Sequence, residues 1–189
     1  MDADADADAE ALLIRQAMAG DRRAYGELVR RHQGRVRALL RRLCREDAAL
    51  ADDLAQDALV QAWRRLEHFR GEAAFGTWLY RIAYNTFLMH VRRPSVRSTQ
   101  PLDERWDADD AGPAAESGAD LVAQGEVRRA LDCLSEPERA VIVHCYYLDL
   151  SHREAAFVIG CPLGTLKSHL ARALQKLRRR LGEDIPVRI

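Results

Sequence analysis

Three carboxylates stand close together on one predicted helix, and their spacing admits two kinds of chemistry. Asp52, Asp53 and Asp57 fall within a few residues of one another, and Asp53 and Asp57 are four apart and share a helix face. Such a pair can ligate a divalent cation, but no histidine or partner carboxylate motif accompanies it. Acids near a helix start are also favoured by the helix dipole. A polar face that docks on another protein fits these residues at least as well.

Cysteines and histidines offer a second candidate for chemistry. The chain has four scattered cysteines, namely Cys44, Cys133, Cys145 and Cys161. They form no CxxC pair, so neither a zinc ribbon nor a redox motif is indicated. His144 and His152, taken with Cys145 and Cys161, match the spacing of no standard metal site. We therefore expect buried or incidental thiols, with no metal, no cofactor and no catalytic residue.

Polar and basic residues gather on the last predicted helix, opposite a stripe of leucines. Leucines at spacings of three and four predict this helix over residues 163–181. Away from the stripe lie Thr165, Lys167, Ser168, His169, Arg172 and Lys176. A DNA major groove admits one helix, whose N-terminal turns approach the base edges while later basic residues meet phosphates. The alternative is an ordinary solvated basic helix.

Aromatic residues interleaved with arginines form another candidate surface in the first half of the chain. The set comprises Phe69, Phe75, Trp78, Tyr80, Tyr84 and Phe87 with Arg70, Arg81, Arg92 and Arg93. Aromatic faces beside basic groups suit single-stranded DNA. Phe75 and Trp78 also lie on an apolar helical stripe and are expected in the core. Tyr80, Tyr84, Asn85 and the arginines are therefore the better candidates for strand contact.

Helical periodicity and capping signals place these residues on elements. Apolar spacings of three, four and seven predict a long helix from Tyr25, a second over residues 50–66, and a third beginning near Phe75. Capping boxes at residues 135–138 and 151–154 each mark a further helix start. The short helix after the second box, a glycine-containing break and the final helix predict a helix-turn-helix.

Charge is distributed unevenly along the 189 residues, although the formal net charge is zero. Acids concentrate in residues 2–10 and 103–120, and bases in residues 22–45, 92–97 and 167–180. The average therefore hides basic surfaces separated by acidic segments. No apolar run approaches the roughly 20 residues that span a membrane, and the acidic N-terminus lacks a secretory layout. We expect a soluble, cytoplasmic protein with no membrane insertion.

These patterns predict an all-α fold of two small helical domains joined by a flexible acidic linker. Residues 1–20 form an acidic tail, expected to be disordered, together with the start of the first helix. Residues 21–94 form the first domain. The helical spacing of apolar residues is absent from residues 95–120. We interpret this segment as the linker, because compact domains rarely contain so long a loop without secondary structure. Residues 121–189 form the second domain, which contains the helix-turn-helix.

Two separate sets of motifs resemble one known family. ADDLAQD at residues 51–57, FRG at 69–71 and TWLYRIAYN at 77–85 resemble conserved region two of the extracytoplasmic-function (ECF) sigma factors. LSEPER at 134–139, YYL at 146–148 and GCPLGTLKS at 160–168 resemble region four. The resemblance spans nearly the whole chain apart from the tail and the linker, with both sets in the expected order.

The resemblance implies a non-enzymatic DNA-binding subunit that directs core RNA polymerase to promoters and is held inactive by an anti-sigma factor. The residues expected to dock on the clamp helices of the polymerase largest subunit are Asp52, Asp53, Leu54, Gln56, Asp57, Gln61 and Trp63. Those expected to meet the melted minus-ten strand are Arg70, Tyr80, Arg81, Tyr84, Asn85, Arg92 and Arg93. The final helix would read the minus-thirty-five element as duplex. The flap of the polymerase is a further expected partner.

Some positions depart from the family pattern. Met89 stands where an aspartate is frequent, which puts a polar contact near the minus-ten strand in doubt. His169 and Leu174 occupy positions where arginine is common, and Asp57 replaces the more usual glutamate. Three other classes remain as alternatives: a transcriptional regulator with a terminal helix-turn-helix, a metal-dependent nucleic-acid enzyme that uses the aspartates, and a helical adaptor that does not bind DNA.

Overall fold

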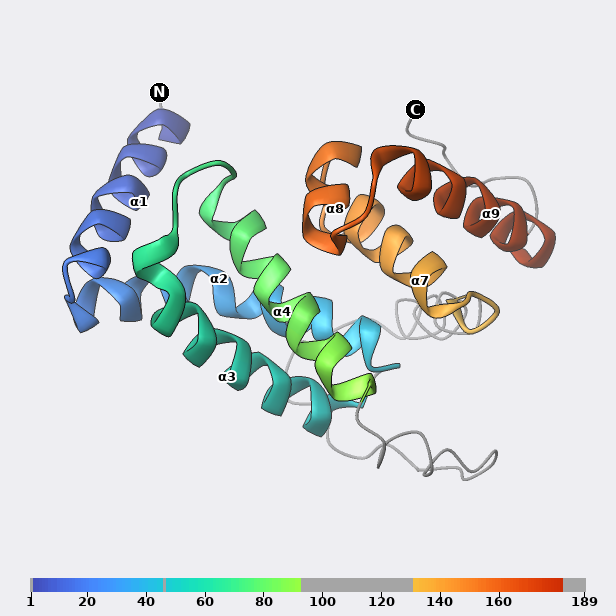
Figure 1. Ribbon diagram of the computed structural model, residues 1–189, viewed down its shortest axis with the longest axis horizontal. Coiled ribbons are helices and arrows are strands. Elements are labelled where there is room, and N and C mark those ends of the chain that lie inside the picture. The colour runs from blue at the N-terminus through green and yellow to red at the C-terminus, as the bar shows by residue number, and fades with distance from the viewer. Residues whose placement is uncertain (1, 46, 93–130, 182–189) are drawn as a thin grey trace.

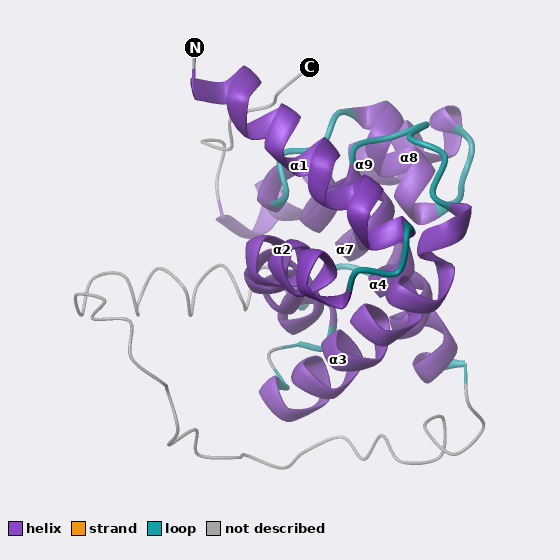
Figure 2. Cartoon of the chain, turned by 90° about the vertical axis from the view of Figure 1, so that its left-hand side faces the viewer, coloured by secondary structure: helices purple, strands orange, loops and turns teal. Residues whose placement is uncertain are grey.

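The computed structural model of the chain describes residues 2–45, 47–92 and 131–181, and within them every regular element is a helix or helical turn (Figures 1 and 2). The N-terminal group consists of α1 (Asp2–Met18), α2 (Arg22–Leu43), α3 (Ala48–Arg65), the 3₁₀ turn η1 (Leu66–His68) and α4 (Phe75–Val91). The C-terminal group consists of α7 (Glu136–Ile142), the π-helical turn η2 (Val143–Tyr147), α8 (His152–Ile159) and α9 (Leu163–Leu181). The predicted all-α fold is confirmed.

Aspartates begin the two long helices that carry the first domain. The Asp21 side chain accepts hydrogen bonds from the backbone N–H groups of Arg23 at 2.7 Å and Ala24 at 3.3 Å, at the start of α2. Asp47 accepts one from Leu50 at 3.0 Å, at the start of α3. Each carboxylate satisfies donors that have no partner inside the helix. The apolar faces of α2, α3 and α4 then pack together around fully buried leucines, Leu28, Leu39, Leu40, Leu66 and Leu79.

Both predicted capping boxes are present in the C-terminal group. The backbone N–H of Ser135 donates to Glu138 Oε2 at 2.9 Å, and that of Ser151 donates to Glu154 Oε2, also at 2.9 Å. Gly160 ends α8 with a φ of 74°, a left-handed conformation that glycine adopts without strain. The tight turn that follows lets α9 cross over α8, and Leu166, Leu170 and Leu174 are buried beneath it. The helix-turn-helix is therefore formed as predicted.

The acidic N-terminus differs from the prediction. The sequence predicts a disordered tail, whereas α1 begins at Asp2 and lies against α2 and η1. Alanine is the best helix former, and aspartates near a helix start favour its dipole. Asp6 pairs with Arg31 at 3.0 Å, and Glu10 lies 2.9 Å from His32 Nε2. The predicted disorder is therefore wrong for Asp2–Met18. The predicted linker, residues 95–120, lies outside the described residues, and the domain limits stay predictions.

The two groups of helices are packed against each other. α4 contacts α8, and α2 contacts both η2 and α7. In Figure 1 the C-terminal helices lie at the upper right, next to α4 and the far end of α2. Buried Ala140, Val143 and Val158, from the C-terminal group, belong to the same apolar cluster as the core of the N-terminal group. The interface between the two groups is therefore a continuation of the first core.

Candidate nucleic-acid and protein interfaces

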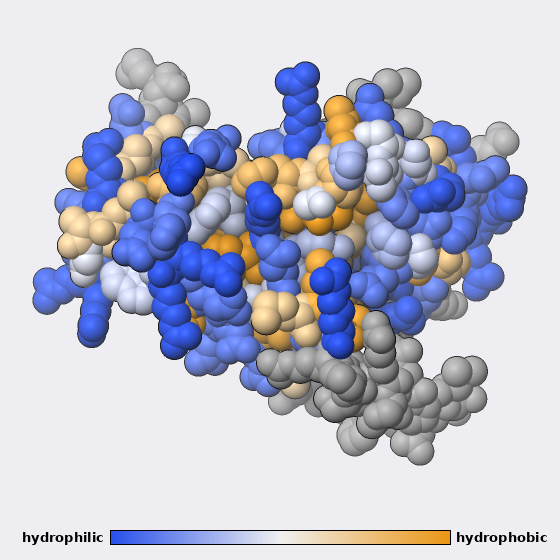
Figure 3. All heavy atoms as spheres, in the orientation of Figure 1, coloured by the Kyte–Doolittle hydropathy of each residue, from blue (hydrophilic) through white to orange (hydrophobic). Residues whose placement is uncertain are grey.

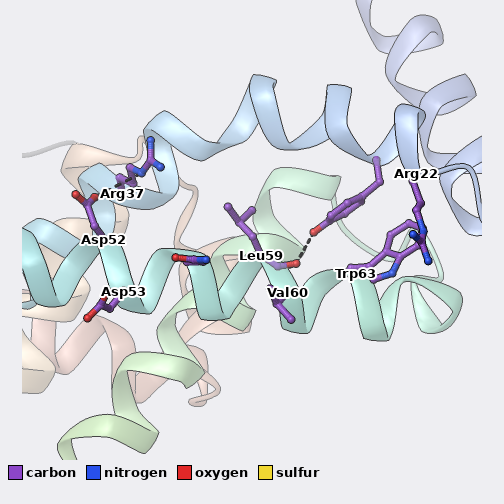
Figure 4. Close-up of a pocket in the computed structure, with 9 residues that line it drawn as sticks. Arg22, Arg37, Asp52, Asp53, Leu59, Val60 and Trp63 are labelled. Atoms are coloured by element: carbon purple, nitrogen blue, oxygen red, sulfur yellow. Dashed lines mark hydrogen bonds and ion pairs between the residues drawn. The ribbon is translucent and has the colours of Figure 1, made fainter.

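A groove of about 500 Å³ runs between α2 and α3 (Figure 4). At one end the Asp52 carboxylate lies 3.5 Å from Arg37 Nε and 3.9 Å from Arg41 Nη2, and the Asp52 and Arg37 side chains are both 49% exposed. These charges are paired but remain open to solvent, so each pair contributes little to stability. They are available to an incoming partner.

Aromatic side chains form the other end of this groove. The Tyr25 ring lies 4.9 Å from the Trp63 ring, and the Tyr25 hydroxyl donates to the Leu59 carbonyl at 2.5 Å. Burial raises the pKa of Tyr25 to about 12, against the opposing effect of a backbone hydrogen bond at Trp63. Val60, one turn before Trp63, is 45% exposed. This end of the groove is therefore apolar, whereas the end at Asp52 is charged.

The predicted docking residues do not all reach this groove. Asp52, Asp53, Gln56 and Trp63 line it. The others lie elsewhere on α3: Leu54 is buried in the core, whereas Asp57 and Gln61 face a second hollow between α3 and α4. There the Gln61 amide donates to Thr86 Oγ1 at 3.3 Å. Because α3 packs against both α2 and α4, some of its polar residues lie beside α2 and others lie beside α4.

Three groove residues on α2 were missed by the sequence reasoning, namely Arg22, Tyr25 and Arg37. The apolar spacing places Tyr25 on the core-facing stripe of its helix. Its hydroxyl could have indicated a position near the surface, because a buried tyrosine usually has a hydrogen-bond partner for this group. The arginines could not have been singled out, since α2 contains many arginines and only the pairing with α3 selects among them.

The aromatic and basic residues of α4 are arranged differently from the expectation. Tyr80 and Tyr84, predicted to contact a strand, are each only 4% exposed. Burial is the main cause that raises the pKa of both, that of Tyr84 to about 12. Trp78, which was expected in the core, is instead only partly buried. Tyr80 and Tyr84 are one helical turn apart and both face inward, so Trp78 is the more accessible ring on α4.

The exposed members of this set surround a hollow of about 320 Å³. Arg70, Trp78 and Arg81 line it together with Phe69, whose ring meets that of Trp78 edge-on at 5.2 Å. Phe157 of α8 completes the lining, together with His68, Glu72 and Ala73. Asn85 and Arg92 are also exposed along or at the end of α4, and Arg93 lies outside the described residues. Guanidinium groups beside partly open aromatic rings suit an unstacked base and its phosphates.

The outer face of α9 is open to solvent (Figure 3, right). Thr165, Lys167 and Ser168 are exposed at its N-terminal end, although the Ser168 hydroxyl donates to the Gly164 carbonyl at 2.9 Å. Arg172 Nη2 lies 3.0 Å from His169 Nδ1, and a guanidinium can only donate, so Nδ1 accepts. The proton of the neutral His169 ring therefore lies on Nε2.

Lys176 has a partner inside its own domain. Its Nζ lies 2.7 Å from Glu138 Oε2, and the Glu138 side chain is only 5% exposed. Burial acts to raise the pKa of Glu138, but hydrogen bonds from Lys176 and Ser135 outweigh it and lower the pKa to about 2. Lys176 thus ties α9 to the start of α7.

In the part of the chain that the structure describes, no three histidine, cysteine or acidic side chains gather closely enough to hold a metal ion. His144 is fully buried, with Nδ1 2.7 Å from the Ala140 carbonyl, and Cys145 is buried beside it. Among these same residues, no helix is both long and apolar enough to cross a membrane.

Comparison with known proteins agrees with this geometry. The family described as "Sigma-70 region 2" matches residues 28–96, and that described as "Sigma-70, region 4" matches residues 124–177. The ECF RNA polymerase sigma factor SigM of Mycobacterium tuberculosis is 37% identical, over 92% of this chain and 85% of that protein. The chain belongs to the ECF sigma factors. The sequence-based resemblance is confirmed, and an ECF sigma factor is a transcription initiation factor that gives RNA polymerase its promoter specificity.

Other relatives cover similar lengths. The RNA polymerase sigma-H factor of Pseudomonas aeruginosa is 34% identical over 89% of this ECF sigma factor and 92% of its own chain. The solved structure of RpoE in complex with the anti-sigma factor NepR from Bartonella quintana is 28% identical, with a TM-score of 0.69 over 85% of this chain and 98% of that one. The solved structure of CnrH in complex with the cytosolic domain of CnrY is 28% identical, with a TM-score of 0.68 over 94% of this chain and 99% of that one.

Proposed function

We propose that this sigma factor binds core RNA polymerase through the groove between α2 and α3. The observation that carries the proposal is the combination of paired but exposed charges at Asp52 with an uncovered apolar end at Val60 and Trp63. Such a surface offers both a buried anchor and a polar rim, the two parts of a stable protein interface. The clamp helices of the largest subunit are the proposed partner, and the flap is the proposed partner of the C-terminal domain.

The two DNA-binding surfaces have separate roles in this proposal. α9 enters the major groove of the minus-thirty-five element, with Thr165, Lys167, Ser168 and His169 toward the bases and Arg172 toward phosphate. His169 donates from Nε2, so it favours an acceptor such as guanine N7 or O6, or thymine O4. Lys176, whose charge is paired with that of Glu138, stabilises the domain.

The melted minus-ten strand is proposed to lie along the exposed edge of α4. Arg70, Arg81 and the Trp78 ring form the hollow that receives an unstacked base, and Asn85, Arg92 and Arg93 follow the strand. The buried rings of Tyr80 and Tyr84 support α4 from below in this assignment. An anti-sigma factor is the proposed negative regulator, by analogy with the complex named for the RpoE neighbour.

The protein acts in this scheme as a non-enzymatic subunit, and its site of action is the cytoplasm because its polymerase partner works there. Transcription in vitro tests the whole proposal. Core polymerase with the purified protein should initiate at a discrete set of promoters in genomic DNA, read by sequencing the 5′ ends of the transcripts. Core polymerase alone is the control. Absence of any specific start site would refute the assignment.

A further inference from the structure

The base-receiving hollow on α4 is supported by a buried ring. Phe75 is only 4% exposed, and its ring centre lies 5.6 Å from that of Phe69 and 5.6 Å from that of Trp78, the two partly open rings of the hollow. It meets Phe69 edge-on, at an interplanar angle of 83°. A close-packed ring in contact with both Phe69 and Trp78 restricts the movement of each. The shape of the hollow therefore depends on the position of Phe75.

His32 of α2 packs on Phe75. Their ring centres are 5.3 Å apart, at an interplanar angle of 61°, and the His32 side chain is only 13% exposed. Gly76, the next residue of α4, leaves room for this histidine, because a Cβ at Gly76 would lie 3.4 Å from both Cε1 and Nδ1 of His32. The first turn of α4 therefore lies directly against the imidazole.

Glu10 of α1 orients this imidazole. Its Oε1 lies 2.9 Å from His32 Nε2. A carboxylate only accepts hydrogen bonds, so Nε2 carries a proton and donates to Glu10. The same helix α1 contacts η1, the turn that leads directly into Phe69 (Figure 1). α1 is thus linked to the hollow by two routes, through His32 to Phe75 and through η1 to Phe69.

We propose that Glu10 and His32 are positioning residues for the strand-binding hollow, which makes α1 a part of the minus-ten recognition surface. This inference rests on the proposed role of Trp78 in receiving an unstacked base. Glu10 orients the His32 ring, and that ring supports Phe75. Phe75 in turn supports Phe69 and Trp78. Rings that are already in place before the base arrives lose less conformational freedom on binding, which increases the affinity for the strand.

The negative charge of Glu10 allows this role to be distinguished from simple electrostatics. An acidic residue near a site for DNA repels phosphates, so electrostatics alone predicts that its removal strengthens strand binding. Positioning predicts the opposite sign for Glu10→Ala, because His32 then lacks its acceptor. Glu10→Gln keeps a side-chain oxygen that can accept the same hydrogen bond, so it should bind the strand at least as tightly as the wild type.

Strand binding by the assembled holoenzyme tests the proposal. The probe is a fluorescent single-stranded oligodeoxynucleotide with the minus-ten sequence of a promoter mapped by transcription in vitro, and core polymerase alone gives the background. Glu10→Ala and His32→Gln should each bind it on the order of fivefold more weakly than the wild type, the size expected for a lost ring contact. His32→Gln keeps a donor for Glu10 but has no ring to place against Phe75. Unchanged or tighter binding by Glu10→Ala overturns the proposal.

Asp6→Ala is the matched control for Glu10→Ala. Asp6 is an acidic residue one turn earlier on α1, and it also pairs with a residue of α2, lying 3.0 Å from Arg31. Its removal should not weaken strand binding, and neither should Leu12→Ala, which shortens a side chain that is 49% exposed on α1. All variants should bind core polymerase as the wild type does. Equal weakening by Asp6→Ala, or a parallel loss of polymerase binding in Glu10→Ala, would show a general structural role of α1 and overturn the proposal.

A double-mutant cycle with Trp78→Ala tests whether Glu10 acts through the hollow. Residues that act through one network have non-additive effects, so Glu10→Ala should weaken strand binding less in the Trp78→Ala background than in the wild type. Additive losses would overturn the positioning role while leaving the proposed function of the hollow intact. Strand binding unaffected by Trp78→Ala alone would instead refute the function of the hollow, and the positioning role with it.

Discussion

At the scale of single residues, His144 is an ionisable group held without charge. Its side chain is fully buried between the two domains, its Nδ1 faces the Ala140 carbonyl, and its Nε2 has no hydrogen-bond partner. Burial lowers the pKa of His144 to about 4, against the opposing effect of the Ala140 hydrogen bond. A buried polar atom of this kind is costly once it must carry a proton.

The free energy of unfolding should therefore fall in mild acid. Because the pKa of His144 is lower in the folded protein than its usual 6.5, the unfolded chain binds the proton first as pH falls from about 6.5 to 4, and stability is lost across that window. His144→Phe keeps a ring against Tyr84 but removes the titration. Urea titrations at pH 7.5 and pH 5.0 measure how much the free energy of unfolding falls between these two pH values. The fall should be about 2 kcal/mol larger in the wild type than in the variant. Equal losses would show that His144 is not the cause.

Lys176 is a second residue whose role depends on its neighbours. It neutralises Glu138, which is buried and whose pKa is lowered to about 2. Lys176→Ala should reduce the free energy of unfolding by about 1–3 kcal/mol, because it leaves a buried carboxylate without its cation. Urea titration at neutral pH measures this. Restored stability in Lys176→Ala/Glu138→Gln would confirm the pairing, and a Lys176→Ala protein as stable as the wild type would count against it.

At the scale of the element, the same helix α9 carries basic residues with different roles. Arg172 is exposed and lies 3.0 Å from the neighbouring His169, whereas Lys176 forms an ion pair with Glu138 of α7. Helix periodicity places both on the polar side, and only the packing of α7 distinguishes them. The interface proposed for DNA is therefore concentrated in the first half of α9.

Arg172→Ala should weaken duplex binding and lower the slope of log affinity against log salt by about one unit, since one phosphate contact is lost. Fluorescence anisotropy with a promoter duplex over a range of salt concentrations measures the slope. Lys167→Ala is a useful comparison on the same exposed face. A slope unaffected by Arg172→Ala would exclude a phosphate contact at this residue.

The groove between α2 and α3 is the proposed binding site for core polymerase, so a substitution in it should weaken that binding. Trp63→Ala removes the ring that packs on Tyr25 and should weaken binding to core polymerase by about tenfold or more, as expected for a buried aromatic anchor. Leu12→Ala should bind as the wild type does. Surface plasmon resonance with immobilised core enzyme gives both affinities, and similar values for the two variants would rule out this groove as the docking site.

At the scale of the whole molecule, the two domains share one apolar cluster. Ala140, Val143 and Val158 bury their side chains against the first domain rather than within the second. Figure 3 shows hydrophobic atoms emerging along the middle of the molecule, where the two groups of helices meet. Stability of one domain is therefore linked to the presence of the other.

Thermal unfolding should reflect this link. The wild type is expected to unfold in a single calorimetric transition, because separating the domains exposes the shared cluster. Tyr147→Ala/Phe157→Ala should split it into two transitions, with the less stable domain melting first. Two transitions already present in the wild type would mean that the domains unfold independently.

Local signals in the sequence predicted most of the helices and the family. The capping boxes at Ser135 and Ser151, the leucine stripe of α9 and the glycine after α8 are interactions between near neighbours, and all formed as predicted. The alternation of alanine and aspartate at the N-terminus predicted a disordered tail because it is poor in apolar residues. The segment is instead the helix α1, which is favoured by the helix propensity of alanine and by contacts with α2.

The arrangement of side chains between elements could not be read in this way. Periodicity shows which residues share a face, but not which partner covers that face, because that depends on contacts between residues distant in the sequence. Tyr80 and Tyr84 are buried, Trp78 is partly open and Lys176 is paired only because α2, α7 and α8 lie where they do. The sequence by itself determined the helices, the helix-turn-helix and the family. The tertiary structure alone decided that Arg81 lies over the Phe157 ring, because these two side chains come from different groups of helices.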